Sequence, residues 1–574
     1  MEKSTYRIAL IGGGPASLFM FKRLVESKIE NLEVAIYERK AQLGAGMPYS
    51  NDGALMEHIT NVSANEIPDI VSTVAEWVNT APSLTLAPYN IITGTLNEYK
   101  VLPRLLFGYY LEDQFRQLLQ IAHKNGIAVN LHLQTDVVDI IDSAGENATW
   151  VKTALGSLNK YNKVVLCTGH KWPQSNQEKN AGYFDSPYPP QKIAKKMNHP
   201  VALRGSSLTA VDAIRTLARA NGHFEEGHNK ELKYIISEDS QDFTMVMHTR
   251  NGLLPAVRFH LDDTHLNNDS LLSEEDIAAH RNENDGFLSL DYIFEKDFKE
   301  IIRAKDPEFY ERIRHLNIEG FVAEMMELRE RLDPFVLLRA EYNEAEKSIK
   351  RHESVFWKEM LAVLSFAMNY PAKYFSAEDM MRLKGTLMPL ISIVIAFLPQ
   401  TSCRELLALH SAGKLDIVPV GEDSEVENLS AGGINYHYTD DEGKKHSDYY
   451  KVFVDCIGQP ALQYEDFPFA GLVEGKVVSP ARLRFRDEAK GAKALEGGNS
   501  NVQQYESGYY LRVPGIGIND DFQVLNQFGA FSERVYIMAV PYIGGYNPDY
   551  SGLDFAEAAS QRIIDSIERE LVVS

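Results

Sequence analysis

The apolar positions near the start of the chain follow a strand–turn–helix–strand order. Residues 6–11 form an apolar run typical of a strand, and a helix is expected from residue 15 to about residue 27. A second strand-like run covers residues 33–38. This order predicts a βαβ unit and therefore a parallel sheet.

The same kind of unit is expected again further along the chain. A helix with apolar residues at helical spacing covers residues 103–125, and a buried strand over residues 163–169 ends in a turn. A new strand begins at Pro200 and is followed by a Gly-Ser turn, a helix through Leu217 and a strand over residues 243–250. The chain therefore contains two units of the dinucleotide-binding type.

Residues 270–400 show a different pattern, in which apolar residues lie three or four apart and the outer faces are charged. We interpret this block as a helical insertion that builds a cap on the substrate side. The alternative is a scaffold or a dimer surface. Its most apolar stretch, residues 387–398, is too short to span a membrane and is expected to be a buried helix or strand; a membrane-contacting surface is the alternative.

The turn after the first strand carries a glycine fingerprint, G-x-G-x-x-[GAS], between a strand and a helix. Its first glycine allows a tight turn, its second lets the backbone approach a pyrophosphate, and the helix N-terminus adds free N–H groups. An acidic residue ends the second strand, where it would accept hydrogen bonds from a ribose hydroxyl. The alternative is a glycine-rich turn in another α/β fold. The predicted dinucleotide ligands are Gly12, Gly14, Pro15, Ala16, Ser17 and Glu38.

The second fingerprint departs from the pattern, because Ser207 stands where the close-approach glycine belongs. Its side chain could push a pyrophosphate away or donate a hydrogen bond to it. Arg250 ends the following strand, where a cation pairs with the 2′-phosphate of NADP. We expect NADPH to bind there, with a degenerate domain kept as scaffold as the alternative. The predicted ligands are Gly205, Ser207, Thr209 and Arg250.

Composition narrows the range of partners. The 574 residues are 44% hydrophobic, which is enough for a large core and several domains. With 58 Lys and Arg against 80 Asp and Glu, the formal charge is −22, and this field repels nucleic acids and anionic lipids. We expect a cytoplasmic protein that acts on a small molecule, with no nucleic-acid partner and no stable membrane insertion. A homo-oligomer is possible.

The cysteine pattern excludes several chemistries. The chain has three cysteines, Cys167, Cys403 and Cys456, and none of them forms a C-x-x-C pair or has the spacing of a zinc site. No metal is expected, and disulfide reduction by a cysteine pair is disfavoured. Cys167 is expected to be a small buried strand residue.

Several shorter motifs add a resemblance to a known family. They comprise a second glycine-rich loop, an Asn-Val turn, a Pro-Arg helix start, a strand-end Thr-Gly and a C-terminal glycine-rich turn, at residues 43–49, 58–62, 103–111, 167–169 and 544–554. Together they resemble the two-domain FAD/NAD(P)-binding flavoproteins with a glutathione-reductase-like fold. They are most similar to bacterial FAD/NAD(P)-binding proteins related to flavin monooxygenases, near which an FAD-dependent urate hydroxylase is placed.

The resemblance implies an α/β fold with two Rossmann-like dinucleotide-binding domains, for FAD and NAD(P), and a helical insertion. The FAD-binding domain is expected over residues 1–195 and 459–574. The NAD(P)-binding-like domain is expected over residues 196–265 and 401–458, and the insertion, a possible substrate cap, over residues 266–400.

The resemblance also implies further FAD ligands. The backbone of Val137 would contact adenine, and the helix that starts near Gly552 would point its N-terminus at the pyrimidine edge of the flavin. The implied ligands are Arg39, Gly46, Met47, Asn61, Val62, Arg104, Val137, Cys167, Thr168, Gly169, Gly552 and Leu553.

The predicted function is that of an FAD-dependent oxidoreductase, namely an NADPH-dependent monooxygenase acting on a small molecule. His58 and Asn61 are the candidate catalytic residues beside the flavin, and His170 is a further acid–base candidate; structural histidines are the alternative. An open, mostly apolar pocket is expected, lined by the insertion and by His58 or Asn61. The alternative functions are a flavin reductase or oxidase without oxygen insertion, and a non-catalytic redox-sensing flavoprotein.

Overall fold

The computed structural model describes residues 5–169, 175–228, 231–261, 271–440, 442–459, 461–505, 508–548 and 552–573. The chain opens with the predicted βαβ unit, made of β1 (Tyr6–Ile11), α1 (Pro15–Glu26) and β2 (Leu32–Glu38). β1 and β2 pair in parallel, and Ile8, Ala9 and Leu10 are fully buried. Burial of consecutive strand residues is the mark of a parallel sheet that is covered on both faces.

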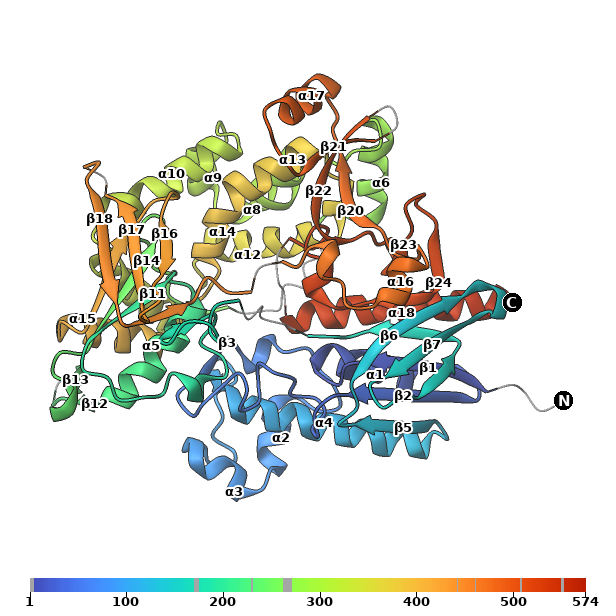
Figure 1. Ribbon diagram of the computed structural model, residues 1–574, viewed down its shortest axis with the longest axis horizontal. Coiled ribbons are helices and arrows are strands. Elements are labelled where there is room, and N and C mark those ends of the chain that lie inside the picture. Colours follow the sequence, from blue (N-terminus) through green and yellow to red (C-terminus); the bar gives the residue numbers. More distant parts are fainter. Residues whose placement is uncertain are drawn as a thin grey trace.

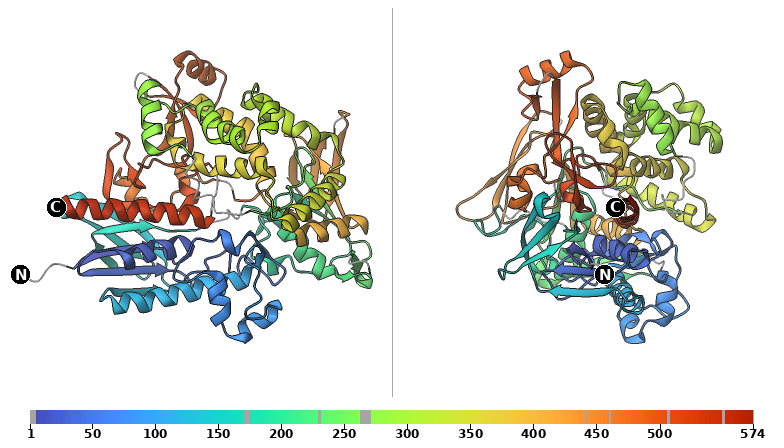
Figure 2. Two further views of the ribbon diagram at one scale, coloured as in Figure 1. Left: turned by 180° about the vertical axis from the view of Figure 1, so that it is seen from behind. Right: turned by 90° about the vertical axis from the view of Figure 1, so that its right-hand side faces the viewer.

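The sheet of this first domain has the strand order β23-β24-β9-β1-β2-β5 (Figure 1). Strands β24, β9, β1, β2 and β5 are parallel, and β23 is antiparallel to β24. The C-terminal helix α18 (Gly552–Val573) runs along α1 on one face of the sheet (Figure 2). The other bounds are β5 (Ala128–Leu133), β9 (Lys163–Leu166), β23 (Gln523–Leu525), β24 (Phe531–Ile537) and α4 (Arg104–Lys124).

Smaller elements extend the first domain. Two antiparallel sheets, β6-β7-β8 and β20-β22-β21, and the strand pair β3-β4 lie outside the central sheet. Their bounds, with those of the nearby helices, are β3 (Ile59–Ser63), α2 (Val74–Thr80), α3 (Ser83–Leu86), β4 (Val101–Pro103), β6 (Val137–Ser143), β7 (Ala148–Thr153), β8 (Leu158–Tyr161), α16 (Ala470–Glu474), β20 (Pro480–Arg484), α17 (Glu488–Glu496), β21 (Val502–Tyr505) and β22 (Gly508–Ile516).

A second parallel sheet, with the order β10-β19-β11-β14-β15, forms the other dinucleotide-type unit. Its elements are β10 (Tyr183–Phe184), β11 (Pro200–Arg204), α5 (Leu208–Asn221), β14 (Thr244–Thr249), α15 (Gln400–Ser411), β15 (Leu415–Pro419) and β19 (Val452–Asp455). A hairpin is formed by β17 (Ile434–Thr439) and β18 (Lys445–Tyr450), with β16 (Glu425–Asn428) beside it. A second hairpin joins β12 (Gly222–Glu226) and β13 (Leu232–Ile236).

The block between these two parts of the second unit is helical, as its apolar spacing predicts. The rings of Phe294, Phe298 and Phe321 pack against one another in its own buried core. The helices are α6 (Glu274–Glu283), α7 (Leu290–Phe294), α8 (Glu300–Lys305), α9 (Pro307–Ile313), α10 (Ile318–Arg331), α11 (Pro334–Arg351), α12 (Phe356–Asn369), α13 (Ala377–Arg382) and α14 (Met388–Val394).

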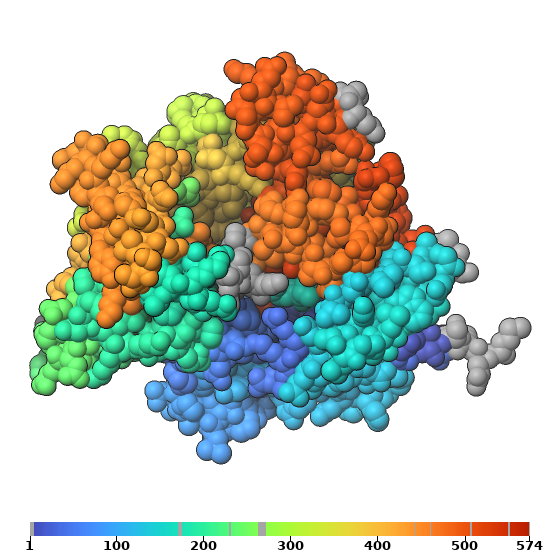
Figure 3. All heavy atoms as spheres, in the orientation of Figure 1, coloured from blue at the N-terminus to red at the C-terminus, as the bar shows by residue number. Residues whose placement is uncertain are grey.

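The most apolar stretch of the chain is buried in this block. It forms α14, in which Leu390, Ile391 and Val394 are fully buried, so the prediction of a buried helix is confirmed. Within the described ranges, no helix combines the length and the apolar character that crossing a membrane requires. The fold is therefore α/β with two Rossmann-type sheets and a helical insertion, as predicted. Figure 3 shows that the first domain, the β16–β18 region and the β20–β22 region meet around a recess on one face.

Candidate cofactor and substrate site

The first glycine loop is held in a conformation that only glycine adopts without strain. Gly12 has φ +109°, and a Cβ at this position would lie 2.7 Å from the carbonyl oxygen of Cys167. Its N–H donates to the carbonyl of Tyr37 on the neighbouring strand. The loop therefore crosses the ends of β1, β2 and β9, where a dinucleotide binds in a Rossmann fold.

The loop leaves space and unused polar groups next to the N-terminus of α1. A Cβ on Gly14 would meet only the backbone of Gly46, with the Cα at 3.4 Å. No side chain caps α1, so its first N–H groups remain available for an anion. Ser17 Oγ and Thr168 Oγ1 are buried without a hydrogen-bond partner. These orphaned hydroxyls and the cradle formed by Gly14 and Gly46 fit the pyrophosphate of a dinucleotide.

Glu38 is fixed at the end of β2 by two backbone contacts. Its Oε2 accepts from the N–H of Gly13 at 2.7 Å, and its Oε1 accepts from the N–H of Lys40 at 2.9 Å. The carboxylate keeps further lone pairs for a ribose hydroxyl. Arg39 is exposed. The predicted acid therefore lies against the glycine loop.

The start of α18 offers another polar group to this region. Gly552 is exposed and open, whereas Leu553 is buried in the core of the first domain. Asp554 Oδ1 has no hydrogen-bond partner, and burial raises the pKa of this carboxyl to about 7, helped by the charges of Glu66 and Glu557. The dipole at the helix N-terminus opposes that shift. Ser551, which belongs to the same motif, lies outside the described residues.

The second glycine loop differs in how its serines are used. Gly205 again has a positive φ, +101°, and its N–H donates to the carbonyl of His248. Ser206 Oγ donates to the carbonyl of Leu253 at 2.6 Å, and Ser207 Oγ donates to the carbonyl of Cys456 at 3.3 Å. The hydroxyl of Ser207 is thus turned toward the protein, and no side chain caps α5.

The remaining predicted NADPH ligands lie at the same end of the second sheet. Thr209 is half-buried in the first turn of α5. Arg250 follows β14, its side chain is 71% exposed, and it lies 3.8 Å from the exposed carboxylate of Glu422. A solvent-exposed cation at the end of the strand after the loop can reach a 2′-phosphate.

His58 and Arg104 join the two domains instead of facing an open site. Arg104 makes an ion pair with Asp212 of α5 at 2.6 Å, and Tyr188 donates to the same carboxylate at 2.6 Å. His58 is fully buried; its Nδ1 accepts from the N–H of Leu55, and its Nε2 lies 3.2 Å from the carbonyl of Asp212. The charge of Arg104 is therefore paired with Asp212, and both ring nitrogens of His58 have polar neighbours. The roles of both residues at a flavin stay predictions.

The protonation states of this cluster follow from its burial. Burial lowers the pKa of His58 below its usual value, so the ring is neutral at pH 7. Arg104 holds the pKa of Asp212 below its usual range, against the effect of burial. The cluster therefore contains an ion pair between the two domains. No sequence motif points to Asp212 or Tyr188, because their partners are more than 20 residues away along the chain.

The other predicted FAD ligands are placed as follows. Asn61 has an exposed side chain on β3, and its carbonyl accepts from Arg258. Cys167 is buried, and burial raises the pKa of its thiol. The structure places Met47 and Val62 half-buried, Val137 at the start of β6 and Gly169 exposed after β9. His170 lies outside the described residues.

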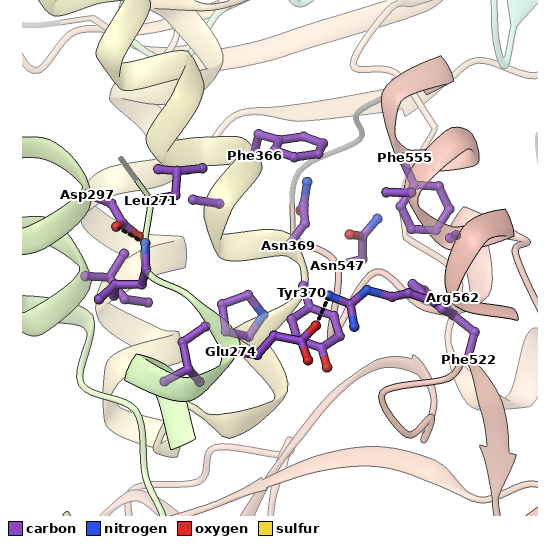
Figure 4. Close-up of a pocket in the computed structure, with 17 residues that line it drawn as sticks. Leu271, Glu274, Asp297, Phe366, Asn369, Tyr370, Phe522, Asn547, Phe555 and Arg562 are labelled. Carbon is purple, nitrogen blue, oxygen red and sulfur yellow. Dashed lines mark hydrogen bonds and ion pairs between the residues drawn. The ribbon is translucent and has the colours of Figure 1, made fainter. Parts of the chain in front are cut away.

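A cavity of about 230 Å³ lies between the helical insertion and α18 (Figure 4). Its walls are mostly apolar and come from α6, α7, α12 and α18. Neither His58 nor Asn61 lines it: His58 is buried at the domain interface, and Asn61 lies on β3. The pocket expected at the flavin, lined by the insertion and by His58 or Asn61, stays a prediction. The polar and charged residues of the lining are Glu274, Asp297, Asn369, Tyr370, Asn547 and Arg562.

Comparison with known proteins gives two matches to protein families. Residues 9–171 match the FAD-NAD(P)-binding family, and residues 273–395 match the YdhS-like middle domain. The chain is 29% identical over 475 residues to the uncharacterized protein YdhS of Escherichia coli K12, a match that covers 82% of this chain and 86% of that protein. The first match agrees with the glycine loops, and the two together support an FAD/NAD(P)-binding flavoprotein.

Solved structures of similar architecture include flavin enzymes. An ornithine N-hydroxylase of Kutzneria sp. 744 is 14% identical, with 99% of this chain and 100% of that one covered and a TM-score of 0.49. A cadaverine monooxygenase of Erwinia amylovora is 12% identical, with 98% and 95% covered and a TM-score of 0.45. A bacillithiol disulfide reductase of Staphylococcus aureus is 10% identical, with 99% of each chain covered and a TM-score of 0.43. At these scores they add nothing to what the two family matches indicate.

Proposed function

We propose that this protein is an FAD-dependent monooxygenase that takes its electrons from NADPH and acts on a small molecule. The observation that carries the proposal is the pair of Rossmann-type sheets, each with a positive-φ glycine loop and an uncapped helix, beside a cavity roofed by the insertion. The match of residues 9–171 to the FAD-NAD(P)-binding family supports both cofactors.

FAD would be held by groups that already converge at the first glycine loop. The N-terminus of α1 and the hydroxyls of Ser17 and Thr168 would bind the pyrophosphate, and Glu38 would accept from the ribose. The N-terminus of α18 would stabilise negative charge at the far end of the cofactor. When bound, the flavin supplies hydride acceptance and oxygen activation, which no side chain can supply.

NADPH would bind at the second loop. The N-terminus of α5 would face its pyrophosphate, and Arg250 would pair with the 2′-phosphate. The buried pair of Arg104 and Asp212 keeps the two domains in a fixed relation, as transfer between two bound cofactors requires. The overall reaction consumes a substrate C–H or N–H bond, O₂, NADPH and a proton, and it yields the hydroxylated product, water and NADP⁺.

The cavity favours oxygen insertion over simple oxidation of NADPH. It is mostly apolar and is covered by the insertion, and a dry pocket protects a reactive oxygen species from water and protons. A reductase or oxidase that inserts no oxygen does not need a covered apolar pocket of this kind.

Oxygen labelling separates these reactions. NADPH consumption is measured under ¹⁸O₂ with a panel of small organic compounds, and products are analysed by mass spectrometry together with hydrogen peroxide. A monooxygenase puts one ¹⁸O atom into a product, and peroxide release falls in the same proportion. If all the electrons appear as hydrogen peroxide with every compound, the protein is an oxidase.

A further inference from the structure

The cavity between the insertion and α18 carries an unusual charge for an apolar pocket. Asp297 is 3% exposed and lines the cavity, and its Oδ1 accepts from the N–H of Leu272 at 2.8 Å. Among the described residues, no cation lies within ion-pair distance of this carboxylate. A buried carboxylate without a cation costs free energy that a bound cation would return.

The local backbone supports a binding role for Asp297. It lies in a π-helical turn over Glu295–Lys299 that separates α7 from α8. Such turns cost helix stability and occur frequently at functional sites. Burial raises the pKa of Asp297 to about 6, so most of the carboxyl is ionised at pH 7.

The other charged groups of the cavity balance each other. Arg562 pairs with Glu274 at 2.6 Å, and its guanidinium stacks on the ring of Tyr370 at 3.7 Å (Figure 4). The charged side chains that line the cavity therefore leave one net negative charge, on Asp297. An anionic ligand is disfavoured there, and a cationic one is favoured.

One further polar group and several apolar walls define the rest of the ligand. Asn547 is 3% exposed, lines the cavity, and has an amide Nδ2 without a hydrogen-bond partner. The remaining lining is largely apolar; its members include Leu271, Ile277, Ile293, Phe366, Phe522 and Phe555. This arrangement accepts a short hydrocarbon body with one charged end and one polar contact.

We infer that this cavity binds a small organic amine, with its ammonium group on the carboxylate of Asp297 and its hydrocarbon body among the apolar walls. Phe555 lies in the first turn of α18 and Asn547 lies shortly before that helix, so the cavity adjoins the end of α18 assigned to the flavin. The amine is the substrate class for the proposed monooxygenase. This part of the inference rests on the proposed function, whereas binding itself does not.

Binding is measured by calorimetry on the purified protein at pH 7.5, with hexylamine, hexan-1-ol and hexanoate as probes that share one hydrocarbon chain. Hexylamine is expected to bind at least about tenfold more tightly than hexan-1-ol, and hexanoate not at all. Equal affinity for the amine and the alcohol, or tighter binding of hexanoate, overturns the inference whatever the variants do.

Two variants locate the amine. Asp297→Asn keeps an oxygen that accepts from Leu272 and removes the charge, so it is expected to lose about tenfold or more of the affinity for hexylamine and to leave that for hexan-1-ol unchanged. Asp276→Asn removes the same charge from a nearby exposed carboxyl outside the cavity and is expected to change neither. Retained amine affinity in Asp297→Asn, with an unchanged thermal midpoint, contradicts the assignment.

A third variant tests the apolar walls. Ala558→Leu adds bulk to the lining of the cavity on α18 and is expected to weaken hexylamine and hexan-1-ol alike. Unchanged binding of both would place the amine elsewhere. These measurements use neither NADPH nor oxygen. Amine binding without ¹⁸O incorporation therefore contradicts the proposed reaction alone, and oxygenation of other compounds without amine binding contradicts this inference alone.

Discussion

The two glycine loops occupy equivalent places in their sheets and yet present different surfaces. In the first, Gly12 and Gly14 leave the helix N-terminus bare, and Glu38 holds the N–H of Gly13. In the second, Ser206 and Ser207 donate to backbone carbonyls of their own domain. In the first loop, the polar contact is made by Glu38, a side chain of the neighbouring strand. In the second loop, the polar contacts are made by the loop's own serine side chains.

This difference indicates how tightly each loop would hold its nucleotide. The first has buried hydroxyls without partners, Ser17 and Thr168, which a permanently bound cofactor would satisfy. The second has its serine hydroxyls satisfied before any nucleotide arrives, and its recognition charge, Arg250, is exposed at the surface. The first loop therefore suits an FAD that stays bound, and the second loop suits an NADPH that binds and dissociates.

The largest effect is expected from adding a side chain to Gly12 in the first glycine loop. Gly12→Ala places a Cβ 2.7 Å from the carbonyl oxygen of Cys167 and forces a positive φ on a non-glycine residue, so we expect loss of FAD from the purified protein. Flavin released by heat is measured against protein concentration. Gly156→Ala is the control, because that glycine also has a positive φ, +86°, but has nothing within 4 Å of its Cβ. Full FAD content in Gly12→Ala would contradict the role of the loop.

The second largest effect is expected at the ion pair between the two domains. Asp212→Asn leaves Arg104, whose side chain is 16% exposed, without its anion, and we expect a loss of about 3 kcal/mol in the free energy of unfolding at pH 7. The native pKa of Asp212 is lowered, so its stabilisation is present at neutral pH and is lost as pH falls through that lowered value. Denaturant unfolding at pH 7 and at about pH 3, below the ordinary pKa of an aspartate, measures both. An equal loss at the two pH values would speak against the ion pair.

A smaller effect is expected at the exposed cation of the second loop. Arg250→Ala removes the partner of the 2′-phosphate, so the preference for NADPH over NADH should fall by about tenfold, with little change for NADH. Rates of flavin reduction at varied nucleotide concentration give the preference. An unchanged ratio would remove Arg250 from this role.

The smallest effect is expected at Ser207. Its hydroxyl is already bonded to the carbonyl of Cys456, so Ser207→Gly should change the affinity for NADPH by less than about threefold. Nucleotide titration against the flavin absorbance tests this. A gain of tenfold or more would mean that the serine, in solution, stands where the pyrophosphate binds.

The local parts of this fold were predictable from the sequence, whereas its long-range contacts were not. Residues 15–26 and 104–124 show helical apolar spacing, and the glycine fingerprint marks the turn after β1. By contrast, the pairing of Arg104 with Asp212 depends on how two domains pack, and sequence spacing carries no signal for it. The burial of His58 was not predictable for the same reason: adjacency to a predicted flavin turn says nothing about the domain packed on its other side.

The cavity was likewise not predictable from the sequence. Apolar spacing indicated that the insertion is helical, but Asp297 reads in sequence as one more charge on an outer face. Only the tertiary structure shows that it is buried next to α18 and lines a pocket with Asn547. The bounds proposed for the domains, with the insertion at 266–400, remain predictions.

Anaerobic reduction tests the central claim most directly, because it requires both loops to work together. The purified protein, loaded with FAD, is mixed with NADPH or NADH in the absence of oxygen, and the flavin absorbance is followed. The account predicts that NADPH bleaches the flavin faster than NADH does. A flavin that stays oxidised with both nucleotides would contradict it.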